Sequence, residues 1–371
     1  MAGRVALAIG VIALILASGC QVSPFGFFDD TAAGVNRDGE SVAGGEPDDQ
    51  FNQARMLVFD SNEAATITGS IAPSSDVDVF DLGPIEAGDR ITVDVTSDGF
   101  GLDAVVAIFD DAGRLVAEND DRNLARGQLD PLLDVTARRS GDSFLLAIAA
   151  ISGTGGYSMD VQIVRGDVVP LPAAQTVFLD FTGGSITLSG RGLQTVPPFD
   201  AAAIDPSLAD QTQVLKDALI DTVMENFDGF DVVILNSDDD APPPAGTFSR
   251  VLLGGFSPRA FGASGAVDSF NADPDDVAVI YIEVFSPDIF RSPVDAQEVG
   301  LAIGNVTAHE IGHLLGLNHV TDPTALMDTV GGPDTLLLDQ DFDLAPLDVT
   351  IFPIGFQDGA LLLAETIGLI P

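Results

Sequence analysis

Three histidines in one short stretch could hold a metal ion. The segment from His309 to His319 reads HEIGHLLGLNH and contains all three histidines of the 371-residue chain. His309 and His313 are four residues apart, which on an α-helix places both imidazoles on one face, one turn apart. Gly316 can take positive φ and end the helix, so that His319 returns as a third nitrogen ligand. The spacing therefore predicts a metal site held by three imidazoles.

Glu310 lies between the first two histidines, where it could act as a base. A carboxylate beside a bound zinc can take a proton from water that the metal has acidified, which produces a hydroxide able to attack a peptide carbonyl. Three protein ligands leave one coordination position for water, as in catalytic rather than structural zinc sites. A bare His-Glu-x-x-His arises by chance in many chains, but the added glycine and third histidine make coincidence much rarer. The pattern therefore predicts a hydrolytic zinc site.

The residues after the third histidine extend this pattern. The chain continues to Ala325-Leu326-Met327, and alone Met327 would be ordinary core filler. After the extended histidine motif, however, it resembles the Met-turn that closes the floor beneath the zinc in metzincin peptidases. The Ala-Leu-Met form resembles the matrixin-like branch of that clan. The resemblance implies a zinc endopeptidase with the three histidines as ligands and Glu310 as the catalytic base.

Two departures leave the subfamily open. Val320, directly after the third histidine, matches none of the polar residues that the best-known subfamilies use there. Astacin-like and serralysin-like members carry a tyrosine just after the Met-turn, whereas this chain has only Tyr157 and Tyr281, neither in that place. The resemblance therefore identifies the clan but not the subfamily.

An α+β domain from residue 173 to 371 is expected to position these residues. Strands are expected at 176–181, 231–235, 250–254 and 277–284, with an amphipathic helix from Asp205-Pro206 to Gly229. Ser292, Pro293 and Asp295 indicate a capping-box start for the zinc-motif helix. Its glycines at 300, 304 and 312 cost helix propensity, which favours close approach to a sheet behind it. A last apolar helix at about 358–367 is too interrupted to span a membrane.

Residues 46–167 show a different pattern, of short alternating apolar runs separated by Gly, Asp and Ser. Their spacing predicts an all-β sandwich of jelly-roll type. The phrases at 76–80, 110–121 and 155–158 resemble the bacterial pre-peptidase C-terminal domain, which implies an accessory role in targeting or in surface or substrate binding. A passive spacer is the alternative. The expected strands are 65–71, 77–82, 90–96, 104–109, 114–118, 132–136, 144–151 and 157–164.

The beginning of the chain resembles a bacterial lipoprotein signal. Residues 1–19 contain Arg4 and a thirteen-residue apolar or small run, too short to span a bilayer as a helix. The sequence LASGC resembles a lipobox, which implies lipid attachment at Cys20, the only cysteine. Plain secretion is the alternative. With Cys20 used this way, disulfides are excluded. Residues 20–45 are rich in small residues and indicate a flexible tether.

The charge composition limits which partners the chain can bind. The chain has 57 Asp and Glu against 15 Lys and Arg, a net charge of −42. This charge repels phosphate backbones, so nucleic-acid binding is disfavoured, and it opposes docking on anionic lipid. The membrane contact is then the lipid anchor. Calcium binding is left open for the acidic clusters at Glu46, Asp48 and Asp49 and at Asp120 and Asp121.

These observations predict a multidomain chain: an all-β jelly-roll-like sandwich followed by an α+β metzincin-like zincin domain. We expect a zinc endopeptidase of the cell envelope, exposed to the periplasm or the cell surface. The metzincin resemblance implies that its protein substrates lie along an edge strand around Gly262 to Ser269. The alternative is a surface adhesion or binding lipoprotein with a non-catalytic zinc site. The intact Glu310 argues against it, because metal storage needs no base. Hydrolysis of a non-peptide amide at the same zinc is a third possibility.

Overall fold

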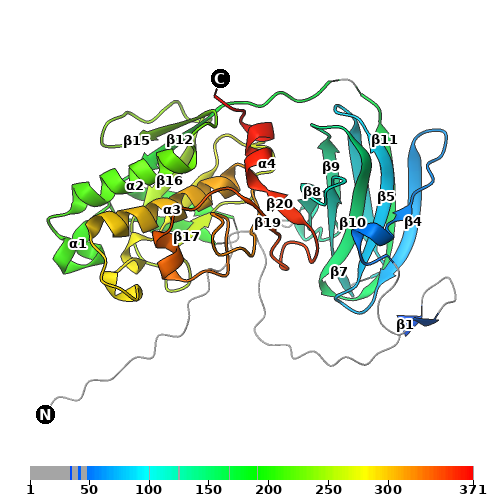
Figure 1. Cartoon of the computed structure of the whole chain (residues 1–371), viewed down its shortest axis with the longest axis horizontal. Coiled ribbons are helices and arrows are strands. Elements are labelled where there is room, and N and C mark those ends of the chain that lie inside the picture. Colours follow the sequence, from blue (N-terminus) through cyan, green and yellow to red (C-terminus); the bar gives the residue numbers. More distant parts are fainter. Residues whose placement is uncertain are drawn as a thin grey trace, which may run out of the picture. The chain divides into compact units, whose positions relative to one another are not determined.

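The computed structural model describes residues 34–35, 41–42, 48–99, 101–123, 126–166, 168–189 and 191–370. The expected signal segment 1–19, with Cys20, lies outside these residues. Within the expected tether, β1 (Gly34–Val35) pairs with β2 (Ser41–Val42). The rest divides into two compact units (Figure 1). We call them the sandwich unit, which ends at Leu171 but includes Leu344–Asp358, and the zinc-motif unit, Pro172–Asp343 with the residues from Gly359 onward.

The sandwich unit contains two sheets, with strand orders β3-β5-β10-β7-β8 and β4-β11-β6-β9. All eight strands expected from the apolar runs are present, and they are β4 to β11. In β11 the side chains at 157, 159, 161 and 163 are buried and alternate with more exposed ones, as in a strand with one face on the core. The elements are η1 (Phe51–Gln53), β3 (Arg55–Met56), β4 (Ala64–Ile71), β5 (Val77–Ile85), β6 (Arg90–Ser97), β7 (Leu102–Phe109), β8 (Leu115–Asn119), β9 (Leu132–Thr136), β10 (Gly141–Gly153) and β11 (Gly155–Val164).

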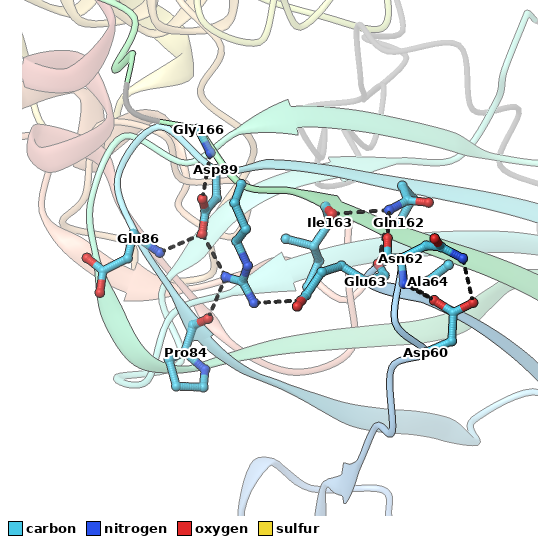
Figure 2. A network of polar contacts seen from close by, with 11 residues as sticks. Asp60, Asn62, Glu63, Ala64, Pro84, Glu86, Asp89, Gln162, Ile163 and Gly166 are labelled. Carbon is cyan, nitrogen blue, oxygen red and sulfur yellow. Dashed lines mark hydrogen bonds and ion pairs between the residues drawn. The ribbon is translucent and has the colours of Figure 1, made fainter.

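A polar network fixes the end of β11 to the turn between β5 and β6. Asp89 accepts hydrogen bonds from the backbone N–H groups of Glu86 and Gly166, each at 3.0 Å, as Figure 2 shows. The Arg165 guanidinium donates to Asp89 at 2.8 Å and to Glu63 at 3.0 Å. The point at which the chain leaves the sandwich is therefore held by charged and backbone groups together.

The segment Leu344–Asp358 corrects the expected continuous domain from 173 to 371. It contains β19 (Leu344–Pro346) and β20 (Phe356–Asp358), and its apolar residues join the core of the sandwich unit. Phe352 is 0% exposed and meets Phe109 of β7 edge to face, with ring centroids 5.5 Å apart. The backbone N–H of Phe356 donates to the carbonyl of Gly113 at 3.0 Å. This cover explains why β7 is apolar almost throughout: both of its faces are buried.

The zinc-motif unit is built on a five-stranded sheet with order β15-β12-β16-β18-β17. Four strands are parallel, and β17 runs antiparallel to β18 at the edge. Figure 1 shows α2 and α3 side by side. The elements are β12 (Gln175–Asp180), β13 (Gly184–Leu188), β14 (Gly192–Val196), α1 (Ala201–Ile204), η3 (Pro206–Leu208), α2 (Thr212–Asn226), β15 (Val232–Asn236), β16 (Ser249–Leu253), β17 (Gly262–Ser264), β18 (Val277–Ile280), η4 (Ile282–Val284), η5 (Pro287–Ile289), α3 (Ala296–Leu314), η6 (Pro333–Leu337) and α4 (Gly359–Thr366).

Two expected elements are shorter than the sequence suggested. The strand expected at 277–284 ends at Ile280, after which the chain turns into η4. The helix expected from Asp205 is divided: Asp205 caps only the short η3, and α2 begins at Thr212. In each case apolar residues continue across a change of backbone conformation, so the apolar pattern alone does not mark the boundary.

The zinc-motif helix α3 begins at Ala296, with Asp295 as its N-cap. The capping box joins Asp295 to Glu298, so the expected start at Ser292 lies three residues too early. Gly300 and Gly304 serve close packing, but against α2 and not against the sheet. A Cβ at Gly300 would lie 2.7 Å from the Cβ of Ala218. In the described part of the chain no helix is long and apolar enough to cross a membrane.

Candidate metal centre

The structure brings the three histidines together. His309 and His313 lie one turn apart on α3, and the chain turns back at Gly316, which has φ 93°, to bring in His319. The Nε2 atom of His319 lies 3.2 Å from that of His309 and 3.0 Å from that of His313. Zinc binds imidazole nitrogen at about 2.0–2.1 Å in tetrahedral geometry, which separates two ligand nitrogens by about 3.3–3.4 Å. The donor set therefore fits one zinc ion.

Hydrogen bonds orient two of the three rings. Nδ1 of His309 lies 2.8 Å from the carbonyl oxygen of Leu326, and Nδ1 of His313 lies 2.7 Å from that of Leu317. Carbonyl oxygens only accept, so each Nδ1 donates and each Nε2 keeps its lone pair for a metal. Burial lowers the pKa of His309 to about 4 and that of His319 to about 3, and it lowers the pKa of His313 well below its usual value. The rings are therefore neutral at neutral pH, as metal ligands must be.

Glu310 is buried beside the histidines, beneath the first residue of β17. A Cβ on Gly262 would lie 2.5 Å from Oε1 of Glu310, so a glycine is needed there to make room for the carboxylate. Burial raises the pKa of Glu310 to about 8, against the opposing charge of Arg191 and a hydrogen bond from the backbone of Ser264. Oε2 is buried and has no hydrogen-bond partner in the described structure. A carboxyl oxygen in this state is suited to taking up and releasing a proton.

Met327, the residue of the expected Met-turn, packs against the metal-binding helix at Gly312. It is buried, and a Cβ on Gly312 would lie 2.6 Å from its sulfur atom. The carbonyl oxygen of Met327 accepts a hydrogen bond at 2.9 Å from the backbone N–H of Val320, next to His319. Met327 therefore supports the helix from below and ties down the segment that carries the third histidine.

Arg191 is a residue near the site that the sequence analysis did not identify. It lies at the turn between β13 and β14, a hairpin that packs on β17 and β18 through an apolar cluster. Its charge opposes the burial-driven rise in the pKa of Glu310 and in that of Tyr281. Gln194 joins this group, because its Nε2 donates to the carbonyl of Arg191 at 3.0 Å and its Oε1 accepts from the Tyr281 hydroxyl at 3.4 Å. The hairpin thus brings a cation into the surroundings of the base.

The acidic clusters do not resemble the histidine site. Among the described residues, the histidines are the one group of three or more His, Cys, Asp or Glu whose ligand atoms converge closely enough for a metal ion. Asp48 and Asp49, and likewise Asp120 and Asp121, form no such group there. Glu46 lies outside the described residues. The structure therefore gives calcium no support, while it supports zinc at the histidines.

Comparison with protein families gives one match, to the matrixin model over residues 261–347. The matched stretch begins just before β17 and includes the three histidines, Glu310 and Met327. The comparison with curated proteins found no match. The matrixin match and the three-histidine site together support a zinc metallopeptidase.

Several solved structures are similar to parts of the chain. The pre-peptidase C-terminal domain of a Bacillus anthracis collagenase is 16% identical, with TM-score 0.23, over 32% of this chain and 100% of that one. A zinc-dependent peptidase from Methanocorpusculum labreanum is 15% identical, with TM-score 0.24, over 44% and 92%. The archaemetzincin of Methanopyrus kandleri is 14% identical, with TM-score 0.26, over 46% and 89%.

Proposed function

We propose that this chain is a zinc-dependent endopeptidase that hydrolyses peptide bonds of extracellular or envelope proteins. The observation that carries the proposal is the convergence of three neutral imidazole Nε2 atoms, at 3.0 and 3.2 Å, beside a buried carboxylate. Metal storage would require the imidazoles alone. Hydrolysis also requires a base, and the carboxylate of Glu310, the next residue of the helix, can supply it.

Glu310 supplies the proton transfers. A zinc ion held by the three histidines would act as a Lewis acid that acidifies water and polarises the scissile carbonyl. Glu310 takes a proton at its carboxylate from the attacking water and passes it to the leaving amine.

The edge strand β17 supports an extended peptide as the substrate. One side of β17 pairs with β18, and within the described sheet its other side pairs with no further strand. An extended chain can add to such an edge through main-chain hydrogen bonds. Because Glu310 lies beneath Gly262, a peptide along β17 would pass directly over the base.

We also propose that the chain is located at the cell envelope, which the sequence alone supports. Lipid attachment at Cys20 would hold the mature chain at the envelope, where its substrates would be envelope or extracellular proteins. Several acyl chains are enough for stable anchoring.

The test is the cleavage of a mixed peptide library by the purified mature chain, with and without a chelator, and by a Glu310→Gln variant. We expect cleavage that the chelator abolishes, and a variant that binds zinc but does not cut. Glu225→Gln, which removes an exposed carboxylate from α2, is the matched control and should cut like the parent. Equal cleavage by Glu310→Gln and the parent would refute the mechanism. A zinc-loaded parent that cuts no peptide would favour the binding-protein alternative.

A further inference from the structure

A hollow lies directly beside the metal ligand His309. Its volume is about 390 Å³, with the adjoining open solvent included. One wall is α3, with Asn305 and Val306, and another is the segment with Leu326 and Asp328. The η6 region closes the far side with Thr335. A group bound at the metal would therefore have this hollow next to it, and a side chain beside a scissile bond could enter it.

Apart from one N–H of Gln340, the amide and hydroxyl donors of Asn305, Thr335 and Gln340 are used. Nδ2 of Asn305 donates to two backbone carbonyls at 3.0 Å each, the Thr335 hydroxyl donates to a third at 2.7 Å, and Nε2 of Gln340 donates to a fourth at 3.4 Å. What these groups still offer to a ligand is acceptor capacity, because hydroxyl and amide oxygens carry two lone pairs each. The hollow is therefore suited to a side chain that donates hydrogen bonds.

Asp328 gives the hollow a negative charge. It is 9% exposed, and its two carboxylate oxygens accept from the backbone N–H groups of Val330 at 2.7 Å and Gly331 at 2.6 Å. With a further hydrogen bond from the backbone of Thr329, the carboxylate still keeps acceptor capacity, because its two oxygens carry about four lone pairs in all. No lysine or arginine is among the residues that line the hollow. Burial raises the pKa of Asp328, and the nearby charge of Asp322 raises it further, so a cationic ligand would relieve both effects.

We infer that this hollow selects substrates with a lysine or arginine next to the scissile bond, held by Asp328 and the surrounding acceptors. The inference rests on the proposed peptidase function and adds a substrate class to it. The net charge of −42 acts in the same direction, because it concentrates cationic peptides near the protein. A glutamate or aspartate at the same position would meet the carboxylate of Asp328 and is excluded.

The first test reads the residues that flank each cut in the mixed library. We expect lysine and arginine to be enriched on one side of the cut. A matched pair of peptides, with lysine or the uncharged norleucine at that position, should differ at least about tenfold in kcat/KM, since charge-assisted hydrogen bonds are about twice as strong as neutral ones. Equal cleavage of the pair would overturn the inference and leave the proposed function standing. A chain that cuts no peptide refutes the function itself.

The second test assigns the preference to Asp328. In Asp328→Asn the ratio of lysine to norleucine cleavage should fall to about twofold or less, mainly through slower cleavage of the lysine peptide. Glu225→Gln is the control, because it removes one negative charge from an exposed position of α2 and does not line the hollow. It should keep the parent ratio. If Asp328→Asn keeps the ratio, the assignment to this hollow is wrong. If the variant folds poorly, the parent decides: a parent with no preference for the lysine peptide also contradicts the assignment.

Discussion

Gly262 and Glu310 fit against each other so closely that a single methyl group would separate them. A Cβ at Gly262 would lie 2.5 Å from Oε1, 2.7 Å from Cγ and 2.9 Å from Cδ of Glu310. The edge strand on which a substrate would lie and the base that would act on it are thus in direct contact. The position of the carboxylate is set by the absence of a side chain on β17.

Gly262→Ala should therefore damage catalysis more than folding. The methyl group meets the flexible end of Glu310, which can move aside at little cost in stability, but the carboxylate is then misplaced. A displacement of about 1 Å can cost about 100-fold in rate, so we expect kcat/KM to fall about 10- to 100-fold. Zinc content and the thermal midpoint should stay near those of the parent. Parent-like kcat/KM would show that β17 does not position the base.

Phe352 should stabilise the sandwich although its segment, Leu344–Asp358, is distant in sequence from the strands β3 to β11. Phe352→Ala removes a fully buried ring from the cluster around Phe109 and should cost about 3–5 kcal/mol of unfolding free energy. Val349→Ala is the matched control on the same segment, because Val349 is 72% exposed, and it should change stability by less than about 0.5 kcal/mol. Urea unfolding of the full chain, followed by hydrogen exchange of β7 and β10 amides, measures both. Similar effects of the two variants would contradict the assigned packing.

Asp78 should make the stability of the sandwich depend on pH. It is buried on β5 and accepts a hydrogen bond from Tyr157 of the facing sheet. Burial raises the pKa of Asp78 from 3.8 to about 7. The folded state therefore keeps this proton between pH 3.8 and 7 while the unfolded state releases it, so the contribution to stability is complete below pH 3.8 and is lost as the pH rises to about 7.

Asp78→Asn removes this dependence. The stability of the variant relative to the parent should rise by up to about 4 kcal/mol from pH 4 to pH 8 and then level off. Asp111→Asn, at an exposed turn, should show no comparable trend. Urea unfolding of the sandwich at several pH values gives the comparison. A difference between Asp78→Asn and the parent that does not change with pH would contradict a raised pKa.

The metal ligands and the base could be predicted because their spacing is local. Four residues are one helical turn, so the positions of His309 and His313 follow from helix geometry alone, and a glycine at 316 signals the turn to His319. The eight sandwich strands were also predictable, because each has its own alternating run between turn residues. In these cases the physical cause lies within a dozen residues of its effect.

Arg191 and Phe352 could not be predicted, because each acts through contacts between distant parts of the chain. Arg191 comes to the base on the hairpin of β13 and β14, because that hairpin packs on β17 and β18, which follow much later in the chain. Leu347, Ile351 and Phe352 form an apolar run that could have packed in either unit. The surface that they cover, on β7 and β10, lies about 200 residues earlier in the chain, and only the folded structure pairs the two.

The path of the chain also determines what a single proteolytic cut between the two units would do. The polypeptide enters the sandwich a second time at Leu344 and leaves it at Asp358, with Phe352 buried in its core. A single proteolytic nick near residue 170 would cut the upstream connection, yet the sandwich would still enclose a piece of the downstream polypeptide. A single cut near residue 170 therefore cannot release the sandwich from the zinc-motif unit, because Leu344–Asp358 still connects the two.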